Sequence, residues 1–408
     1  MNALPPSGAT ERGAQRRVVN ALGIVQILTW GSSFYLLAVL AAPIARDTGW
    51  PMPWIMGSLS LGLLVAGVAS PRVGVWIGAR GGRPVLMGGC ACIALGLMVV
   101  ATAPHLAVFA VGWCLMGLGM AASLYDAAFA TLGHLYGAAA RRPITLLTLW
   151  GGFASTVCWP VSAVLEAHMG WRGACLAYAA VQLCVSIPLL AMFLPTRSPD
   201  IPPSITPARE PRDAVTEATP GIAAQQDGAR TAFLLLAGII TLVGAIASAM
   251  SVQVLTLLQA RGFSLAEAVA AGAIIGPAQV LARMVEQLSG GRHHPLWTMT
   301  GAVGLIGVGL VLLAAGFPIV AAALAAYGAG NGIFSIAKGT VPLALLGAAH
   351  YPQLAGRLAR PALLAQALAP LAAAYLLAAG GAQGVLAALL ALWLASAILL
   401  IPLWRRHA

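Results

Sequence analysis

Three ionisable side chains lie inside long apolar segments of this sequence: Asp126, Arg283 and Lys338. Burying a charge in hydrocarbon costs at least about 3 kcal/mol, so such side chains mark a cavity, a partner or a pathway. Each follows the start of its segment by about 20 residues, and a helix rises about 1.5 Å per residue. All three are therefore expected at one depth, roughly 30 Å along three helices that run in the same direction.

Lys338 is the only lysine of the chain. A buried lysine releases its proton far more readily than an arginine does, and Asp126 is the natural acid to face it. Two interpretations stay open. The two residues form a structural ion pair that clamps parts of the protein together, or they form a proton-coupling and gating pair that a substrate or a proton releases. A pair that breaks in one conformational state would combine both roles.

Arg283 belongs to a polar stripe that also contains Gly276, Gln279 and Glu286. Residues three and four positions apart share one face of a helix. A planar guanidinium binds a carboxylate or another oxyanion with two parallel hydrogen bonds, which predicts substrate binding by Arg283 and Gln279. The alternative is a structural pair between Arg283 and Glu286, and Glu286 is also a candidate for proton coupling or gating.

Further substrate-binding candidates are aromatic or polar side chains deep in other apolar segments: Trp30, Tyr35 and Gln253. Trp and Tyr prefer the membrane–water interface, so a deep position favours a cavity, although packing between helices also accounts for each residue. The sequence has no phosphate-binding Gly-Lys-Ser/Thr loop and no paired-histidine metal motif. We therefore expect no cofactor, no metal site, no catalytic residue and no enzymatic activity.

Membrane-spanning helices must position these residues. The chain has 408 residues, 60% hydrophobic and 8% charged, whereas a soluble domain is roughly a quarter charged. About 20 apolar residues suffice to cross the membrane as a helix. Such stretches occur near 18–42, 52–73, 84–102, 105–137, 143–167 and 172–194, and near 231–259, 265–289, 296–315, 318–347, 358–379 and 382–404. We predict an all-α integral membrane protein with twelve transmembrane helices in two six-helix bundles, in which Pro160 and Pro277 distort their helices.

The composition divides the chain near its middle. Residues 195–230 are rich in Pro, Ser, Thr and acidic residues, which cannot bury a core and are typical of a linker. The predicted units are a cytoplasmic tail at 1–17, an N-terminal bundle at 18–194, a cytoplasmic linker at 195–230, a C-terminal bundle at 231–404 and a second cytoplasmic tail at 405–408.

The net charge of +11 comes from arginines dispersed over alternate short loops rather than gathered in one basic stripe. This pattern predicts topology instead of nucleic-acid binding, because cytoplasmic loops carry the excess of Lys and Arg. We predict a monomer in the plasma membrane of a bacterium, the inner membrane, with both termini cytoplasmic. Its partners would be the lipid bilayer, a small-molecule substrate, and protons or a counter-ion.

Several short motifs resemble the major facilitator superfamily, and in particular its monocarboxylate-porter and oxalate/formate-antiporter-like branch. They include Tyr35, Asp47-Thr48-Gly49-Trp50, Gly74 and Gly170-Trp171-Arg172. The resemblance implies two bundles that rock about a central cavity lined by helices 1, 4, 7 and 10. In that branch an arginine of helix 8 binds the substrate carboxylate, and Arg283 occupies the similar position.

One motif departs from the family pattern. The loop between helices 2 and 3 resembles Gly-x-x-x-Asp-Arg-x-Gly-x-Arg, and Gly74, Gly81 and Arg83 match it. Gly78 and Ala79 stand where the family has its acidic and basic residues. The charge lock that the motif provides at the gate is therefore missing here.

Together these features favour a secondary active transporter of a small organic or inorganic anion, which works by alternating access coupled to a proton or counter-substrate gradient. One alternative is an efflux pump for a toxic neutral, drug-like or metalloid compound, because Cys158 places a thiol in the middle of an apolar segment. Another is a membrane sensor or assembly subunit that has lost transport activity.

Overall fold

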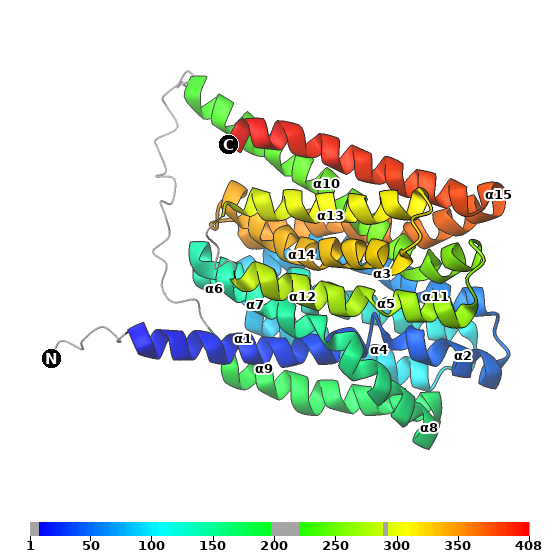
Figure 1. Ribbon diagram of the computed structural model, residues 1–408. Helices are drawn as coiled ribbons and strands as arrows, with labels where there is room; N and C mark the ends of the chain where they lie inside the picture. Colours follow the sequence, from blue (N-terminus) through cyan, green and yellow to red (C-terminus); the bar gives the residue numbers. More distant parts are fainter. Residues whose placement is uncertain (1–7, 197–219, 289–292, 408) are drawn as a thin grey trace.

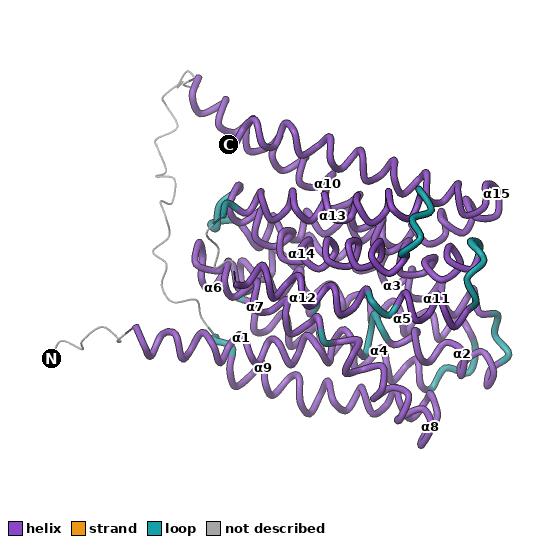
Figure 2. The backbone as a smooth tube through the Cα atoms, viewed as in Figure 1, coloured by secondary structure: helices purple, strands orange, loops and turns teal. Residues whose placement is uncertain are grey.

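The computed structural model describes residues 8–196, 220–288 and 293–407. Helices joined by short turns make up these ranges, and no strand occurs within them, as Figure 2 shows. Lipid offers backbone amides and carbonyls no hydrogen-bond partner, so an apolar chain satisfies them within helices. The prediction of an all-α membrane fold is confirmed.

In the first half of the chain, several membrane segments are built from two consecutive helices. The elements are α1 (Gly8–Gly31), α2 (Leu36–Thr48), α3 (Met52–Arg80), α4 (Gly82–Ala101), α5 (Leu106–Ser123), α6 (Tyr125–Tyr136), a 3-10 turn (Gly137–Ala140), α7 (Arg141–Gly152), α8 (Ala154–Val181), a π-helical turn (Gln182–Ser186) and α9 (Ile187–Phe193).

The second half has fewer, longer helices: α10 (Pro220–Gln259), α11 (Leu265–Gly272), α12 (Ile275–Leu288), α13 (Pro295–Ala314), α14 (Val320–Leu346) and α15 (Tyr351–His407). Two of the long helices contain one residue with non-helical backbone, Gly170 in α8 at φ 69° and Gly381 in α15 at φ 62°. Glycine adopts this left-handed region without a steric penalty. The chain can therefore turn at both points without a loop.

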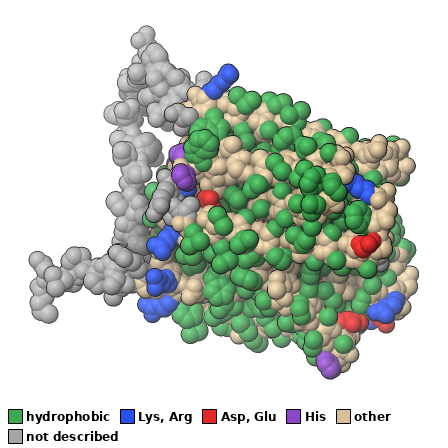
Figure 3. Space-filling view, viewed as in Figure 1, with side chains coloured by type: hydrophobic (Ala, Val, Ile, Leu, Met, Phe, Trp, Pro, Cys, Tyr) green, Lys and Arg blue, Asp and Glu red, His purple; other side chains and the backbone are tan. Residues whose placement is uncertain are grey.

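Nine stretches of the described chain are long and apolar enough to cross a membrane, and two of them contain 88 and 56 residues. The count of twelve crossings stays a prediction. It requires the longer stretch to divide at Gly137 and Gly170 and the shorter one at Gly381. Charged side chains gather at the two ends of the helices, on either side of a hydrophobic belt (Figure 3). Helix α1 begins and α15 ends at the same end (Figure 1).

The predicted linker at 195–230 lies largely outside the described residues. Helix α9 ends at Phe193, and α10 already begins at Pro220. The predicted domain boundaries therefore stay predictions.

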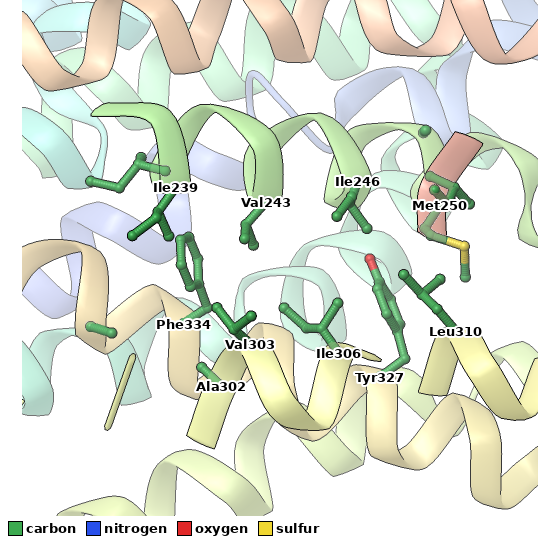
Figure 4. Packing of buried hydrophobic residues seen from close by; sticks show 14 of the residues in the cluster. Ile239, Val243, Ile246, Met250, Ala302, Val303, Ile306, Leu310, Tyr327 and Phe334 are labelled. Atoms are coloured by element: carbon green, nitrogen blue, oxygen red, sulfur yellow. The ribbon is translucent and has the colours of Figure 1, made fainter. Parts of the chain in front are cut away.

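The core of the second half lies where α10 packs over α13 and α14. Figure 4 shows Ile239, Val243, Ile246 and Met250 of α10 pointing toward Val303, Ile306 and Leu310 of α13 and toward Tyr327 and Phe334 of α14. Their spacing of three and four residues makes one helix face. Gly309 and Gly330 let α13 and α14 approach closely, since an added Cβ at either would lie 2.6–2.7 Å from the backbone of the other helix.

The two halves meet along α3 and α15 in what we call the glycine seam: Gly67, Ser70 and Gly74 of α3 with Gly356 of α15. A Cβ at Gly74 would collide with the Pro352 carbonyl, and one at Gly356 with the Ser70 carbonyl. Helix α7 also packs against α12 and α14, and α6 packs against α15. Leu343 and Tyr351 of the second half belong to the core cluster of the first. These contacts lie toward the end of the bundle where α1 begins.

Four membrane segments are interrupted near their middle, at residues 32–35, at Leu124, at Phe153 and at residues 273–274. The last break includes Ala273, which lies four positions before Pro277. Proline has no backbone N–H, so Pro277 cannot form the helical hydrogen bond to the Ala273 carbonyl. Pro160, by contrast, lies inside α8, and the break of that segment is at Phe153.

Candidate functional site

Three of the helix breaks surround the place where the predicted site residues meet. Trp30 lies in the last turn of α1 before the break, Tyr35 is the last residue of the break, Tyr125 and Asp126 directly follow Leu124, and Gly152 precedes Phe153. Irregular backbone at membrane depth is tolerated only where protein buries it or where it lines a cavity. Discontinuous helices of this kind commonly form the binding sites of transporters.

Lys338 of α14 and Asp126 of α6 form an ion pair between the two halves. The Nζ atom lies 3.1 Å from Asp126 Oδ1 and 5.9 Å from the centre of the Tyr125 ring. The side chains are 22% and 32% exposed, respectively. The predicted pairing is thus present in the structure, and both side chains are partly exposed.

Arg283 of α12 is buried and donates hydrogen bonds to three oxygens. Nε bonds the Gly332 carbonyl at 3.2 Å, one terminal nitrogen bonds the Thr148 carbonyl at 3.1 Å, and the other bonds Gln279 Oε1 at 3.4 Å. Gly152 provides the space, because a Cβ there would lie 2.5 Å from the guanidinium. Since Thr148 is in α7, Arg283 fastens the second half of the chain to the first in this conformation.

The polar stripe of α12 divides between two environments. Gln279 joins Arg283 as predicted, whereas Glu286 accepts a hydrogen bond from the Thr298 hydroxyl of α13 at 2.7 Å. Glu286 also interacts electrostatically with Arg141, at the start of α7. The hydrogen bonds of Arg283 thus go to two carbonyls and Gln279 rather than to Glu286, the partner that the alternative interpretation gave it.

Aromatic rings extend outward from the ion pair in an unbroken series. The Tyr125 ring stacks on Phe129 at 5.1 Å and lies 5.3 Å from Trp30, which in turn lies 5.8 Å from Tyr35. Tyr35 contacts Trp159 of α8 edge to face at 6.1 Å. Trp30 and Tyr35 are thus connected to Lys338 by ring contacts that pass through Tyr125.

Hydrogen bonds hold this series in place. Trp30 Nε1 donates to Gln26 Oε1 at 3.2 Å, and Gln26 Nε2 donates to the Ser123 carbonyl at the end of α5 at 2.7 Å. The Tyr125 hydroxyl donates to the Thr148 carbonyl at 3.2 Å, the same oxygen that Arg283 bonds. The aromatic rings and the guanidinium are therefore joined through one backbone oxygen.

Two other candidates make no hydrogen bond to Arg283 or Lys338 among the described residues. Gln253 is buried on α10, and no hydrogen bond in the described ranges links it to Arg283 or Lys338. Cys158 is buried, donates to the Ile27 carbonyl at 3.4 Å and packs against Gly31. Among the described residues no group of three or more His, Cys, Asp or Glu side chains lies together.

Sequence reasoning did not identify Tyr125, Thr148 or Tyr351 as members of the site. Tyr125 precedes Asp126, so its place beside a buried acid was a usable signal. Thr148 contributes a backbone carbonyl, for which a side chain gives no signal. Tyr351 starts α15, donates to the Gly339 carbonyl at 2.7 Å and packs its ring on Gly133, contacts that only the folded arrangement reveals.

Comparison with known proteins places this geometry in a family. The model of the Major Facilitator Superfamily matches residues 22–359. Human monocarboxylate transporter 11 is 31% identical over 199 residues, which make up 48% of this chain and 40% of that protein. The chain therefore matches less than half the length of this relative, whose name agrees with the predicted resemblance to the monocarboxylate-porter branch.

Solved transporters share the whole fold. The human organic anion transporter MFSD10 (TETRAN) aligns with a TM-score of 0.69 at 18% identity, covering 97% of this chain and all of its own. The proton:xylose symporter XylE aligns with a TM-score of 0.71 at 12% identity over 97% of this chain and 96% of its own. The E. coli fucose:proton symporter FucP aligns with a TM-score of 0.67 at 12% identity over 95% of this chain and 98% of its own. Since the family model extends through both halves and the fold recurs in these membrane transporters, the chain belongs to the Major Facilitator Superfamily.

Proposed function

We propose that this chain is a secondary active transporter of a carboxylate or a similar small anion, in which Lys338 receives the anion and Asp126 carries the coupling proton. The observation that carries the proposal is the Asp126–Lys338 ion pair, which joins the two halves and remains partly exposed. An anion that approaches Lys338 competes with Asp126 for the same ammonium group.

The competition supplies a coupling step. When the substrate anion takes the place of Asp126 beside Lys338, the carboxylate loses its cationic partner and becomes the acceptor of the coupling proton. Anion and proton then enter the site together, and the net charge of the pair and its occupants stays unchanged. Moving an uncompensated charge through the membrane is unfavourable, so this neutrality favours the loaded transporter for the conformational change.

Arg283 has a different part in this scheme. Its hydrogen bond to Thr148 joins the two halves, so this bond must break or exchange when the halves rock apart, whereas its bond to Gly332 lies within the second half. A guanidinium has five N–H groups, and the three bonds present leave donors for an anion. Gln279 orients it, and Lys338, which is linked to it through Tyr125, adds positive charge to the same region.

The contacts between halves also suggest the conformational state. The glycine seam and the contacts of α7 with α12 and α14 lie toward the end of the protein where α1 begins and α15 ends. If both termini are cytoplasmic in a bacterial inner membrane, as the arginine pattern predicts, the structure is closed to the cytoplasm. The site would then load from the outer side.

The names of similar proteins support this proposal without defining the substrate. One related structure is that of an organic anion transporter, one relative is a monocarboxylate transporter, and two related structures are proton symporters of sugars. Symport of an anion with a proton combines the anionic substrate of the first two proteins with the proton coupling of the other two.

The proposal is tested in proteoliposomes with an imposed pH gradient, in which uptake of radiolabelled carboxylates is followed. We expect gradient-driven accumulation that disappears when a protonophore collapses the gradient. Exchange of internal for external carboxylate that ignores the gradient would indicate antiport with a counter-substrate. If no solute moves under either condition, the protein is a sensor or assembly subunit and the proposal is wrong.

A further inference from the structure

The outer half of the first bundle contains an open hollow of about 480 Å³ between α2 and α8. Ala38 and Val39 of α2 line one side, and residues of α8 between Ser155 and Ala163 line the other. None of the residues that line it is ionisable, and Ser155 and Thr156 are its polar members. The hollow therefore suits an apolar group and lacks any side chain that would bind a second charge.

The position of this hollow relates it to the site. On α8, Thr156, Trp159 and Ala163 follow one another at three- and four-residue spacing, so they share a helix face. One turn before Thr156, Gly152 lies against the Arg283 guanidinium. The hollow thus begins about one turn along the chain from the residue that touches Arg283, just beyond the break at Phe153.

Trp159 links the hollow with the ion pair. It lines the hollow, is 45% exposed, and contacts Tyr35, the outer end of the aromatic series that leads through Trp30 to Tyr125 and Lys338. An exposed indole beside a tyrosine ring offers a flat surface, on which another ring gains offset or edge-to-face contact beyond its hydrophobic burial.

We propose that the transported anion carries an aromatic or similarly flat apolar body, which binds along Trp30, Tyr35 and Trp159 while the carboxylate lies at Lys338. This inference rests on the proposed function and narrows its substrate class. A small hydrophilic anion would fill the space beside Lys338 and leave the aromatic wall and the hollow in water. An aryl carboxylate covers both.

The geometry also assigns Trp159 a role in specificity rather than in coupling. Trp159 is separated from Lys338 by three other rings, so its removal leaves the ion pair and its proton chemistry in place. Only the apolar body of the substrate then loses a contact surface.

The test compares the dissociation constants of three matched ligands for the purified full chain: 4-(biphenyl-4-yl)butanoate, whose second ring is long enough to extend from Lys338 toward Trp159, butanoate, and the uncharged 4-(biphenyl-4-yl)butan-1-ol. We expect the biphenyl acid to bind at least about tenfold more tightly than either of the others. Trp159→Ala should weaken binding of the biphenyl acid about tenfold and leave that of butanoate unchanged. Trp159→Phe, which retains a ring, should bind both acids nearly as the parent does.

Trp54→Ala is the matched control, because Trp54 is an equally large exposed side chain at the outer end of α3. It should change neither dissociation constant. Equal affinity for the two acids, or equal loss of both in Trp159→Ala, would overturn the inference while the proposed anion transport stands. Binding of the alcohol as tight as that of the acid, together with an absence of carboxylate transport, would instead show that the proposed function fails.

Discussion

The two halves of the protein meet in two chemically opposite ways. At the glycine seam, α3 and α15 approach so closely that a Cβ at Gly74 or Gly356 would collide with the backbone of the partner helix. At the centre, the contact consists of the Asp126–Lys338 pair and the bonds of Arg283 to carbonyls of both halves.

The two kinds of contact have different roles: the seam closes one end of the protein, and the centre responds to substrate and protons. A solute or a proton can replace one partner of an ion pair, so the centre can respond to its occupants. A contact between backbones at a seam of small residues has no such group, and it depends on shape alone. The residues at the missing charge lock fit this account, because the Gln353 side chain occupies the space beside Gly78 that an acidic side chain would need.

The largest expected effect is at the seam. Gly356→Leu adds a side chain where the Ser70 carbonyl and Gly74 already lie, and overpacking of this kind costs about 1–3 kcal/mol. We expect the closed end to open and transport to fall at least about tenfold while the protein remains folded. Initial uptake rates per folded protein measure it. Gly304→Leu on α13 is the control, since nothing lies within 4 Å of a Cβ there. Normal transport by Gly356→Leu would contradict steric closure.

The ion pair should show the next largest effect. Lys338→Met leaves the Asp126 charge without its partner, which should cost about 1–2 kcal/mol because the site is only partly exposed. The double variant Asp126→Asn/Lys338→Met should regain most of that stability yet transport nothing against a gradient. Thermal unfolding measures the stabilities, and losses that add to within about 0.5 kcal/mol would show that the residues do not interact.

The exposed pair of Arg172 and Asp47 provides the matched control for this cycle. These side chains are 46% and 49% exposed, so either single change should cost less than the corresponding change at the centre. Neither change should uncouple transport from the proton gradient. Equal costs at both pairs would mean that the central pair is no more than a surface contact.

Arg283→Lys tests the clamp between halves. Lysine keeps the charge but lacks the planar fork that reaches Thr148, Gly332 and Gln279 together. The loss of hydrogen bonds from a charged group to buried carbonyls costs about 1.5–3 kcal/mol, so we expect lower thermal stability and a smaller change in substrate affinity. Weakened binding at unchanged stability would show instead that Arg283 is chiefly a substrate ligand, as the family resemblance implies.

Tyr125→Phe should have the smallest effect. The ring remains between Trp30 and Phe129, and only the hydrogen bond to the Thr148 carbonyl is lost, at about 0.5–1.5 kcal/mol. Thermal unfolding should detect it, and Tyr375→Phe at an exposed tyrosine of α15 is the control. A loss as large as that of Arg283→Lys would show that the hydroxyl does more than share this oxygen.

The helical membrane fold and the central pair were predictable because both depend on the kind of residue at each position. Long apolar segments permit little except helices in lipid, and a lone lysine and a lone aspartate at equal depth attract each other. The expected distortion near Pro277 was confirmed by the break at residues 273–274. It was predictable because a proline removes one particular backbone hydrogen bond.

The acceptors of Arg283 could not be predicted, because they are backbone carbonyls of Thr148 and Gly332 that become available only once the helices pack. The break at Phe153 rather than near Pro160 is also a consequence of packing: α7 turns there beside Gly152 and the guanidinium. Gly74 stood out in the sequence as a motif residue, but the sequence did not show that it faces α15.

The proton balance of substrate binding tests the central claim most directly. Calorimetric titration of the purified protein with a carboxylate ligand, repeated in buffers of different ionisation enthalpy, gives the number of protons taken up per anion bound. We predict about one proton in the parent chain and none in Asp126→Asn, because the anion displaces the Asp126 carboxylate from Lys338 and that carboxylate is then protonated. The same proton uptake in both proteins, or none in the parent, would contradict the account.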